Sequence, residues 1–82
     1  MSRPDGPVLV IGAGLLGTSI GLALRRQGVD VALSDLHPAH VEIAVGLGAA
    51  NLDAAAVGRP ALVVVAVPPD ALAAVSARAL RD

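Results

Sequence analysis

Short, mainly apolar runs alternate along this chain with stretches in which apolar residues recur at helical spacing. The runs at Val8–Ile11, Val29–Ser34 and Ala61–Val67 each have the length of a strand. The last of them contains no polar side chain, which is expected of a strand that helices cover on both faces. Residues 49–52 have room for a very short further strand.

In the segments between these runs, apolar residues recur at helical spacing. One helix is expected over residues 15–27, with Gly28 directly after it, and a second over residues 38–47. A third is expected over Asp70–Leu80, and residues 54–57 have the pattern of a single helical turn. The residues expected along the buried side of the first two helices are Leu16, Ile20, Ala23 and Leu24 in the first and Val41, Ala44, Val45 and Gly48 in the second.

A glycine-rich turn joins the first strand to the first helix, and its G-x-G-x-x-G spacing in that context is typical of a dinucleotide site. Gly12 permits the tight turn, Gly14 lets the backbone approach a pyrophosphate, and Gly17 lets the helix pack closely on the strand. Gly21 extends that close approach by one helical turn. The N–H groups and the dipole of the helix start favour a bound phosphate. The predicted cofactor-binding residues of the turn are Gly12, Ala13, Gly14, Leu15, Leu16 and Gly17. The alternative is a glycine-rich packing turn without a ligand.

The order of these elements predicts an α/β protein with a parallel sheet. The expected strand order is 3-2-1-4, which is the first β-α-β-α-β half of a doubly wound, Rossmann-like fold. Residues 1–7 are expected to be a flexible lead-in, and residues 8–82 part of a dinucleotide-binding domain. The fourth strand would keep a long apolar edge unpaired, so we expect this chain to be an N-terminal fragment of a longer protein.

Asp35 ends the second expected strand, about 20 residues past the glycine turn, where an acidic residue binds the adenosine ribose in such folds. Its alternative role is that of a turn residue or a cap of the second helix. A 2′-phosphate beside Asp35 would bring like charges together, and no Arg or Lys follows in residues 36–40. The sequence therefore predicts NAD as the cofactor in preference to NADP.

Val67 and Pro68 follow the last strand at the mouth of the expected crevice, and we predict that they line the cofactor pocket. A plain strand end is the equal alternative. We assign no catalytic residue and no metal site. His37 and His40 are read as exposed residues on the adenosine side, with His37 within reach of the adenine. Thr18 and Ser19 are read as packing or helix-start residues, because no base is placed to activate them.

Composition narrows the function classes further. The net charge of −1 gives no field that would attract nucleic acid or an anionic membrane. The start of the chain lacks the apolar segment of a secretory signal, so a cytoplasmic protein is expected. The chain has no cysteine, which excludes disulfides and thiolate ligands. It has no aromatic residue either, and its many alanines predict a thin core and marginal stability.

The stretch Val10–Leu24, VIGAGLLGTSIGLAL, resembles the opening of prephenate and arogenate dehydrogenases, and the Gly17-x-Ser19 pair is its most particular part. Asp35, the Gly46-x-Gly48 stretch and residues 61–69 follow in the family's order and spacing. The resemblance implies NAD-dependent oxidative decarboxylation of prephenate to 4-hydroxyphenylpyruvate in tyrosine biosynthesis. It also implies a catalytic histidine and a substrate-binding arginine beyond residue 82, in a helical second domain that forms a homodimer. We therefore expect prephenate or arogenate as the substrate of the full-length enzyme and no turnover by this chain alone.

Two other interpretations of the function remain open. One is the cofactor domain of a different dehydrogenase, acting on a 3-hydroxyacid or an imine. The other is not an enzyme but a regulatory domain that binds NAD or ATP and switches conformation, as in regulators of potassium transport. Residues beyond position 82 would separate the enzymes from one another, and a preference for ATP would favour the regulator.

Overall fold

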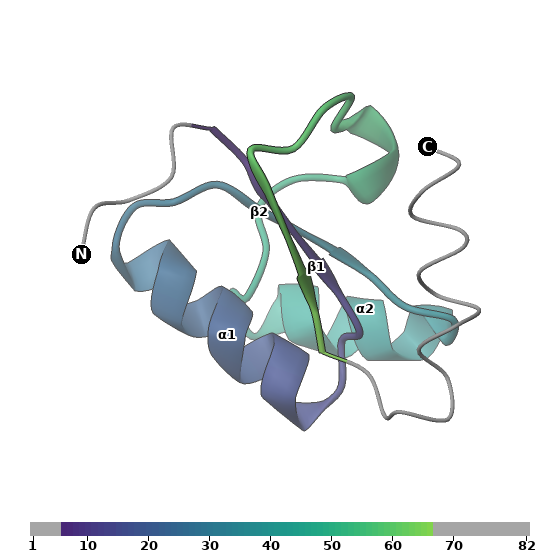
Figure 1. Cartoon of the computed structure of the whole chain (residues 1–82). Coiled ribbons are helices and arrows are strands. Elements are labelled where there is room, and N and C mark those ends of the chain that lie inside the picture. Colours follow the sequence, from purple (N-terminus) through teal and green to yellow (C-terminus); the bar gives the residue numbers. More distant parts are fainter. Residues whose placement is uncertain (1–5, 67–82) are drawn as a thin grey trace.

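The glycine turn stands between a strand and a helix, as the sequence predicts. A computed structural model describes residues 6–66 of the chain (Figure 1). Its elements are β1 (Val8–Ile11), α1 (Leu15–Arg26), β2 (Val31–Ser34), α2 (Pro38–Gly46), the 3-10 turn η1 (Ala54–Ala56) and β3 (Leu62–Val65). The helix expected over Asp70–Leu80 lies outside the described residues.

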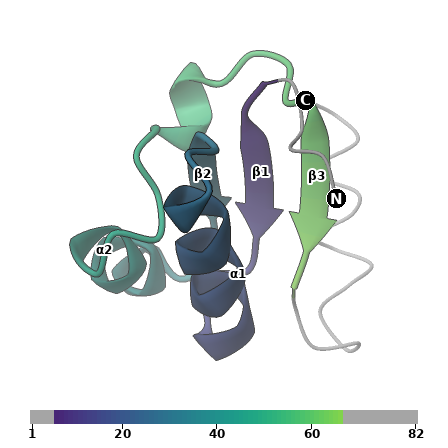
Figure 2. The ribbon, with the colours of Figure 1, turned by 90° about the vertical axis from the view of Figure 1, so that its left-hand side faces the viewer.

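The strands form one parallel sheet in the order β2-β1-β3, with Val8 opposite both Val31 and Leu62 (Figure 2). The α/β fold class is thereby confirmed. The further strand expected over residues 49–52 is reduced to a single parallel bridge between Leu52 and Ala32 of β2. Since Ala32 also pairs with Leu9 of β1, the bridge lies on the outer side of β2, where the order 3-2-1-4 puts it.

Asn51 explains why this segment does not continue as a strand. Its side-chain oxygen accepts the Val31 N–H at 2.8 Å, and its side-chain nitrogen donates to Asp30 at 3.0 Å. The backbone N–H groups of Asn51 and Leu52 both donate to the Val31 carbonyl. The Asn51 side chain thus accepts a hydrogen bond from β2 that a backbone carbonyl would accept in a regular strand.

Helix α1 packs closely at its two glycines, as the motif predicts, but through only half of the expected apolar stripe. Its buried residues are Gly17 and Gly21, with Ile20 and Leu24 partly buried beside them. Leu16 is 63% exposed and Ala23 is exposed, so these two assignments are wrong. The reason is steric: a Cβ on Gly17 would overlap the Gly12 carbonyl, and one on Gly21 would overlap that of Ala49. The helix axis therefore lies too close to its neighbours for larger side chains along that line.

Helix α2 makes a narrower contact than expected. Ala44 is fully buried and Val41 is partly buried against the core. Val45 is 47% exposed and Gly48 is exposed, so the predicted stripe covers only two of its four residues. The small Ala44 side chain brings one turn of the helix close to β2 and leaves the next turn in solvent.

The core is built from small aliphatic side chains. Val8, Val10 and Val31 are its largest fully buried members. The other residues of the cluster are Ala13, Val29, Leu33, Ala44, Ala49 and Ala50. This composition agrees with the thin core that the alanine content predicts.

Within residues 6–66, strand β3 is only partly covered. Leu62, Val63 and Val65 remain 48%, 42% and 40% exposed, while Val64 packs against the core. Helix α1 packs mainly on β1 and β2. Within residues 6–66, β3 pairs only with β1.

Pro7, the last residue of the lead-in expected over residues 1–7, bonds to the segment before β3. The Pro7 carbonyl accepts a hydrogen bond of 2.8 Å from the Ala61 N–H, which ties the start of β1 to the start of β3. Residues 1–5 lie outside the described range. In that range, no helix has the length and apolarity needed to cross a membrane.

We predict that Gly21→Ala lowers the free energy of unfolding by about 1–3 kcal/mol, because the added methyl group overlaps the Ala49 carbonyl. Gly46→Ala is the matched control in α2, since a Cβ there meets nothing within 4 Å. Alanine's better helix propensity should leave this variant unchanged or more stable by up to about 1 kcal/mol. Urea unfolding of the two variants checks the pair, and equal midpoints would contradict the close approach of α1.

Candidate functional site

The glycine turn leaves the carboxyl end of β1 through Gly12, whose φ of +104° lies in the left-handed region. Gly12 donates its N–H to the Ser34 carbonyl at 2.7 Å, which joins the ends of β1 and β2. The turn closes when the Thr18 N–H donates to the Gly14 carbonyl at 2.9 Å and begins the helical ladder. Gly17 then lies directly against Gly12, as the motif predicts.

Gly14 differs from Gly17 because nothing fills the space next to it. A Cβ built there would meet no atom within 4 Å, so the space is open to a ligand. Gly14 is the N-cap of α1, and no side chain caps this helix end. The first N–H groups of a helix have no partner within it, so those of Gly14 to Gly17 are available to an anion. The exposed Leu15 and Leu16 flank this helix start.

Asp35 lies beside the same turn. Its Oδ2 accepts the Ala13 N–H at 2.6 Å, and its Oδ1 accepts the His37 N–H at 2.7 Å. The carboxylate side chain is only 12% exposed, and His40 Nδ1 lies 3.4 Å from Oδ1. One carboxylate thus joins the turn after β1 to the turn after β2.

Burial of Asp35 by itself raises the pKa of this carboxyl. The hydrogen bonds from the N–H groups of His37 and Ala13, together with the His40 ring, outweigh that effect and hold the pKa below its usual range. Asp35 is therefore ionised at neutral pH, where its interactions stabilise the fold. This stabilisation is lost as the pH falls through the lowered pKa.

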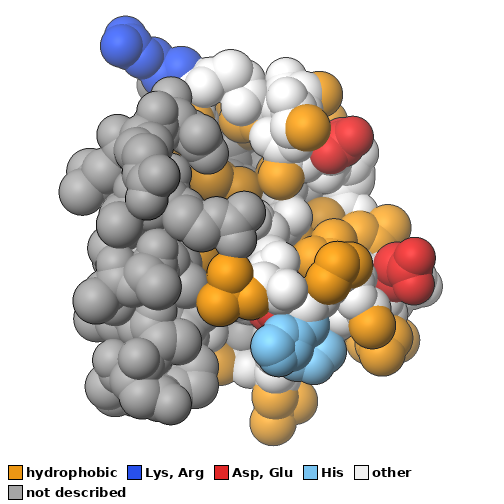
Figure 3. Space-filling model, turned by 90° about the vertical axis from the view of Figure 1, so that its right-hand side faces the viewer, with side chains coloured by type: hydrophobic (Ala, Val, Ile, Leu, Met, Phe, Trp, Pro, Cys, Tyr) orange, Lys and Arg blue, Asp and Glu red, His pale blue; other side chains and the backbone are white. Residues whose placement is uncertain are grey.

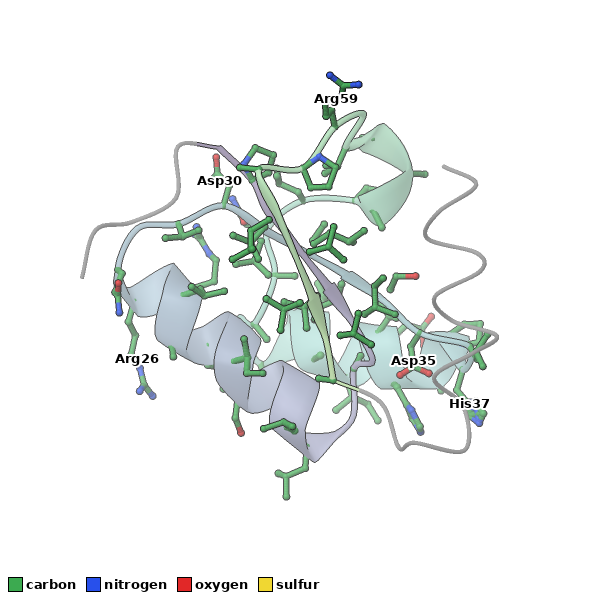
Figure 4. The ribbon with its side chains drawn as sticks, viewed as in Figure 1. Arg26, Asp30, Asp35, His37 and Arg59 are labelled. Carbon is green, nitrogen blue, oxygen red and sulfur yellow. The ribbon has the colours of Figure 1, made fainter. Side chains whose placement is uncertain are left out.

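His37 and His40 are exposed, with ring centroids 4.9 Å apart, on the outer side of the carboxylate. Figure 3 shows the histidine side chains at the surface among hydrophobic ones. The labelled Arg26 and Arg59 lie away from Asp35, and Asp30 lies at the opposite end of β2 (Figure 4). Within residues 6–66, no Arg side chain is thus placed to neutralise the charge of a 2′-phosphate beside Asp35.

The hydroxyl groups of the first helix bond to nearby backbone. Thr18 Oγ1 donates to the Ala13 carbonyl at 3.1 Å, and Ser19 Oγ donates to the Leu15 carbonyl at 2.8 Å. These contacts are those of helix-start residues. Val67 and Pro68, predicted to line the pocket, lie outside the described residues.

Two features of the site were missed by the sequence reasoning. The bond from Ala13 to Asp35 joins residues 22 positions apart, and no local pattern signals it. The approach of His40 to Asp35 does have a signal. His40 stands in the first turn of a helix whose proline at position 38 fixes the start, and this turn follows directly on Asp35.

Comparison with known proteins decides the class of this site. The family model described as the NAD-binding domain of 3-hydroxyacyl-CoA dehydrogenase matches residues 7–72, which is most of the chain. The chain belongs to this family. It is an NAD-binding dehydrogenase domain, and NAD is its cofactor, as predicted.

Two curated relatives of this NAD-binding domain match shorter stretches. A probable prephenate dehydrogenase, NovF of Streptomyces niveus, is 52% identical over 63 residues, which is 74% of this chain and 17% of the relative. The tRNA 5-methylaminomethyl-2-thiouridine biosynthesis bifunctional protein MnmC of Maricaulis maris (strain MCS10) is 49% identical over 37 residues, 45% of this chain and 6% of the relative. The domain thus spans a small part of either relative. No solved structure matches it.

We predict that His40→Ala raises the pKa of Asp35 toward its usual range, because the charge and the hydrogen bond of the imidazole are lost. His37→Ala is the matched control, since it removes the neighbouring ring and keeps the backbone N–H that bonds Asp35. The pH dependence of the Asp35 carboxyl ¹³C shift measures both. A larger rise in His37→Ala than in His40→Ala would contradict the assignment.

Proposed function

We propose that this domain is the NAD-binding part of a prephenate dehydrogenase-like oxidoreductase, which oxidatively decarboxylates prephenate to 4-hydroxyphenylpyruvate. The observation that carries the substrate class is the 52% identity to a probable prephenate dehydrogenase over 63 residues. It agrees with the resemblance of residues 10–24 to that family. The substrate-binding residues, the homodimer contacts and a cytoplasmic location belong to the same proposal.

In this proposal the N–H groups from Gly14 to Gly17 hold the pyrophosphate of NAD. The missing Cβ at Gly14 leaves room for it, and the uncapped start of α1 supplies partial positive charge. Asp35 accepts hydrogen bonds from the adenosine ribose, for which its ionised state is suited. Val67 and Pro68, which lie outside the described residues, are assigned to the crevice on the sequence alone. The nicotinamide ring, when bound, supplies the hydride acceptor.

The same arrangement accounts for the expected preference for NAD over NADP. A 2′-phosphate on the ribose would meet the ionised Asp35 carboxylate at short range. The side chains next to this carboxylate are those of His37 and His40, and residues 36–40 contain no Arg or Lys to bind the additional phosphate.

We predict that Gly14→Ala weakens NADH binding at least tenfold, because the new methyl group takes the space that the pyrophosphate needs. The melting temperature should stay within about 2 °C, since that Cβ contacts nothing in the protein. Isothermal titration calorimetry measures the affinity, with Gly46→Ala as the control and NADPH expected to bind the unaltered chain more weakly than NADH. Unchanged NADH affinity in Gly14→Ala would refute this placement of the pyrophosphate.

Whether this domain can serve as the cofactor domain of a prephenate dehydrogenase is tested in a hybrid enzyme. The 63 matching residues of the Streptomyces niveus relative are replaced by those of this chain, and NADH formation is followed with prephenate. The unaltered relative must first show this activity. We expect the hybrid to retain it within about tenfold and the 82-residue chain alone to show none. A hybrid that binds NADH but does not turn over prephenate would count against the proposal.

The family model favours a second candidate, the cofactor domain of a 3-hydroxyacyl-CoA dehydrogenase, because it matches residues 7–72. The adenosine half of the site would be the same in both enzymes. NAD-dependent turnover of prephenate, compared with that of a 3-hydroxyacyl-CoA, by a longer protein that contains this domain would separate the two candidates.

A further inference from the structure

The Asp35 carboxylate contacts the glycine turn itself, in addition to facing the expected position of the ribose. We propose that Asp35 is a positioning residue for the pyrophosphate amides: its bond to Ala13 holds the turn in the conformation that presents them. This inference rests on the proposed NAD site and assigns Asp35 a second task there. If Asp35 bonded only to the ribose, it could be replaced by another residue without any loss of pyrophosphate binding.

The first argument is the state of the Ala13 peptide groups. The Ala13 N–H is held by Asp35 at 2.6 Å, and its carbonyl is held by the Thr18 hydroxyl at 3.1 Å. Ala13 is only 4% exposed, so water cannot easily replace either partner. Removal of the carboxylate would leave a buried donor without a partner, which favours a rearranged turn.

The second argument is the position of this peptide in the turn. Ala13 stands between Gly12, which sets the left-handed bend, and Gly14, which caps α1. A rotation of the Ala13 peptide would reorient the N–H groups that follow it. The short, charge-assisted bond to Asp35 comes from a different loop and opposes that rotation.

The third argument is that Asp35 is itself held in place. Its other oxygen accepts the His37 N–H at 2.7 Å, at the entry to α2. The carboxylate is thus fixed by one loop and acts on the next, as a residue that positions its neighbour must be. Because Asp35 is ionised at neutral pH, the bond is present under the conditions in which NAD binds.

The test in the free chain is an NMR titration of ¹⁵N-labelled protein. We expect the Ala13 amide proton to shift with the same midpoint as the Asp35 carboxyl carbon, and this dependence to vanish in Asp35→Asn. An Ala13 amide shift that does not follow the carboxyl would overturn the proposal. This measurement needs no ligand, so it decides the point even if NAD fails to bind and the proposed function falls.

A binding cycle separates the two tasks of Asp35. The ligands are NAD and its analogue with a 2′,3′-dideoxy adenosine ribose, which offers the carboxylate no hydroxyl. If Asp35 served only to bind the ribose, Asp35→Ala would leave the affinity for the analogue unchanged. That result would overturn the proposal. We expect Asp35→Ala to weaken the analogue roughly fivefold or more. Asp35→Asn, which keeps an acceptor oxygen, should weaken it less and serves if the alanine variant does not fold.

The matched control is Asp53→Ala. Asp53 also accepts a backbone N–H, from Ala55 at 3.0 Å, and caps η1. Its loss removes one exposed local hydrogen bond in a different part of the chain. Affinity for the dideoxy analogue should stay unchanged in this variant, whereas an equal loss in both variants would mean a general effect on stability and would overturn the positioning role.

Discussion

The close approach of helix α1 to the backbone around it is the constraint on which the rest of this domain depends. Gly17 lies against the Gly12 carbonyl, and Gly21 lies against Ala49. Side chains at these two positions would push the helix away from β1 and from the segment after α2. The helix start would then no longer stand over the carboxyl end of the sheet, where ligands bind in such folds. The absence of side chains at Gly17 and Gly21 therefore determines both the packing of α1 and the position of its start at the ligand-binding end of the sheet.

The electrostatics of the site follow from that placement. The helix start offers uncapped N–H groups to an anion, while the Asp35 carboxylate bonds to the neighbouring Ala13 N–H. Partial positive charge and full negative charge thus lie next to each other, and this suits a ligand with a pyrophosphate at one point and hydroxyl groups at the next. Membership of an NAD-binding family agrees with this pattern.

Sequence patterns predicted the fold class, the strands at Val8–Ile11 and within residues 61–67, and both long helices to within a few residues. They did so because unbroken apolar runs and a glycine turn are local signals. The predicted buried face of α1 was right for Ile20 and Leu24 and for the close approach at Gly17 and Gly21, but wrong for Leu16 and Ala23, because the hydrophobic spacing gave weight to side chains that the glycine contacts leave in solvent. The strand near residue 51 became a single bridge because Asn51 takes its ladder bonds with its side chain. The Ala13–Asp35 hydrogen bond depends on how the turn after β1 meets the turn after β2, and no local sequence pattern predicts that contact.

The uncapped start of α1 has one more consequence. Peptide N–H groups neither gain nor lose protons in the physiological range, so an anion site made from them keeps its charge as the acidity changes. The Asp35 carboxylate that holds this turn has its pKa below the usual range, so it stays ionised near neutral pH as well. A modest change of acidity near neutral therefore leaves the amides and the carboxylate of the coenzyme site in the same state.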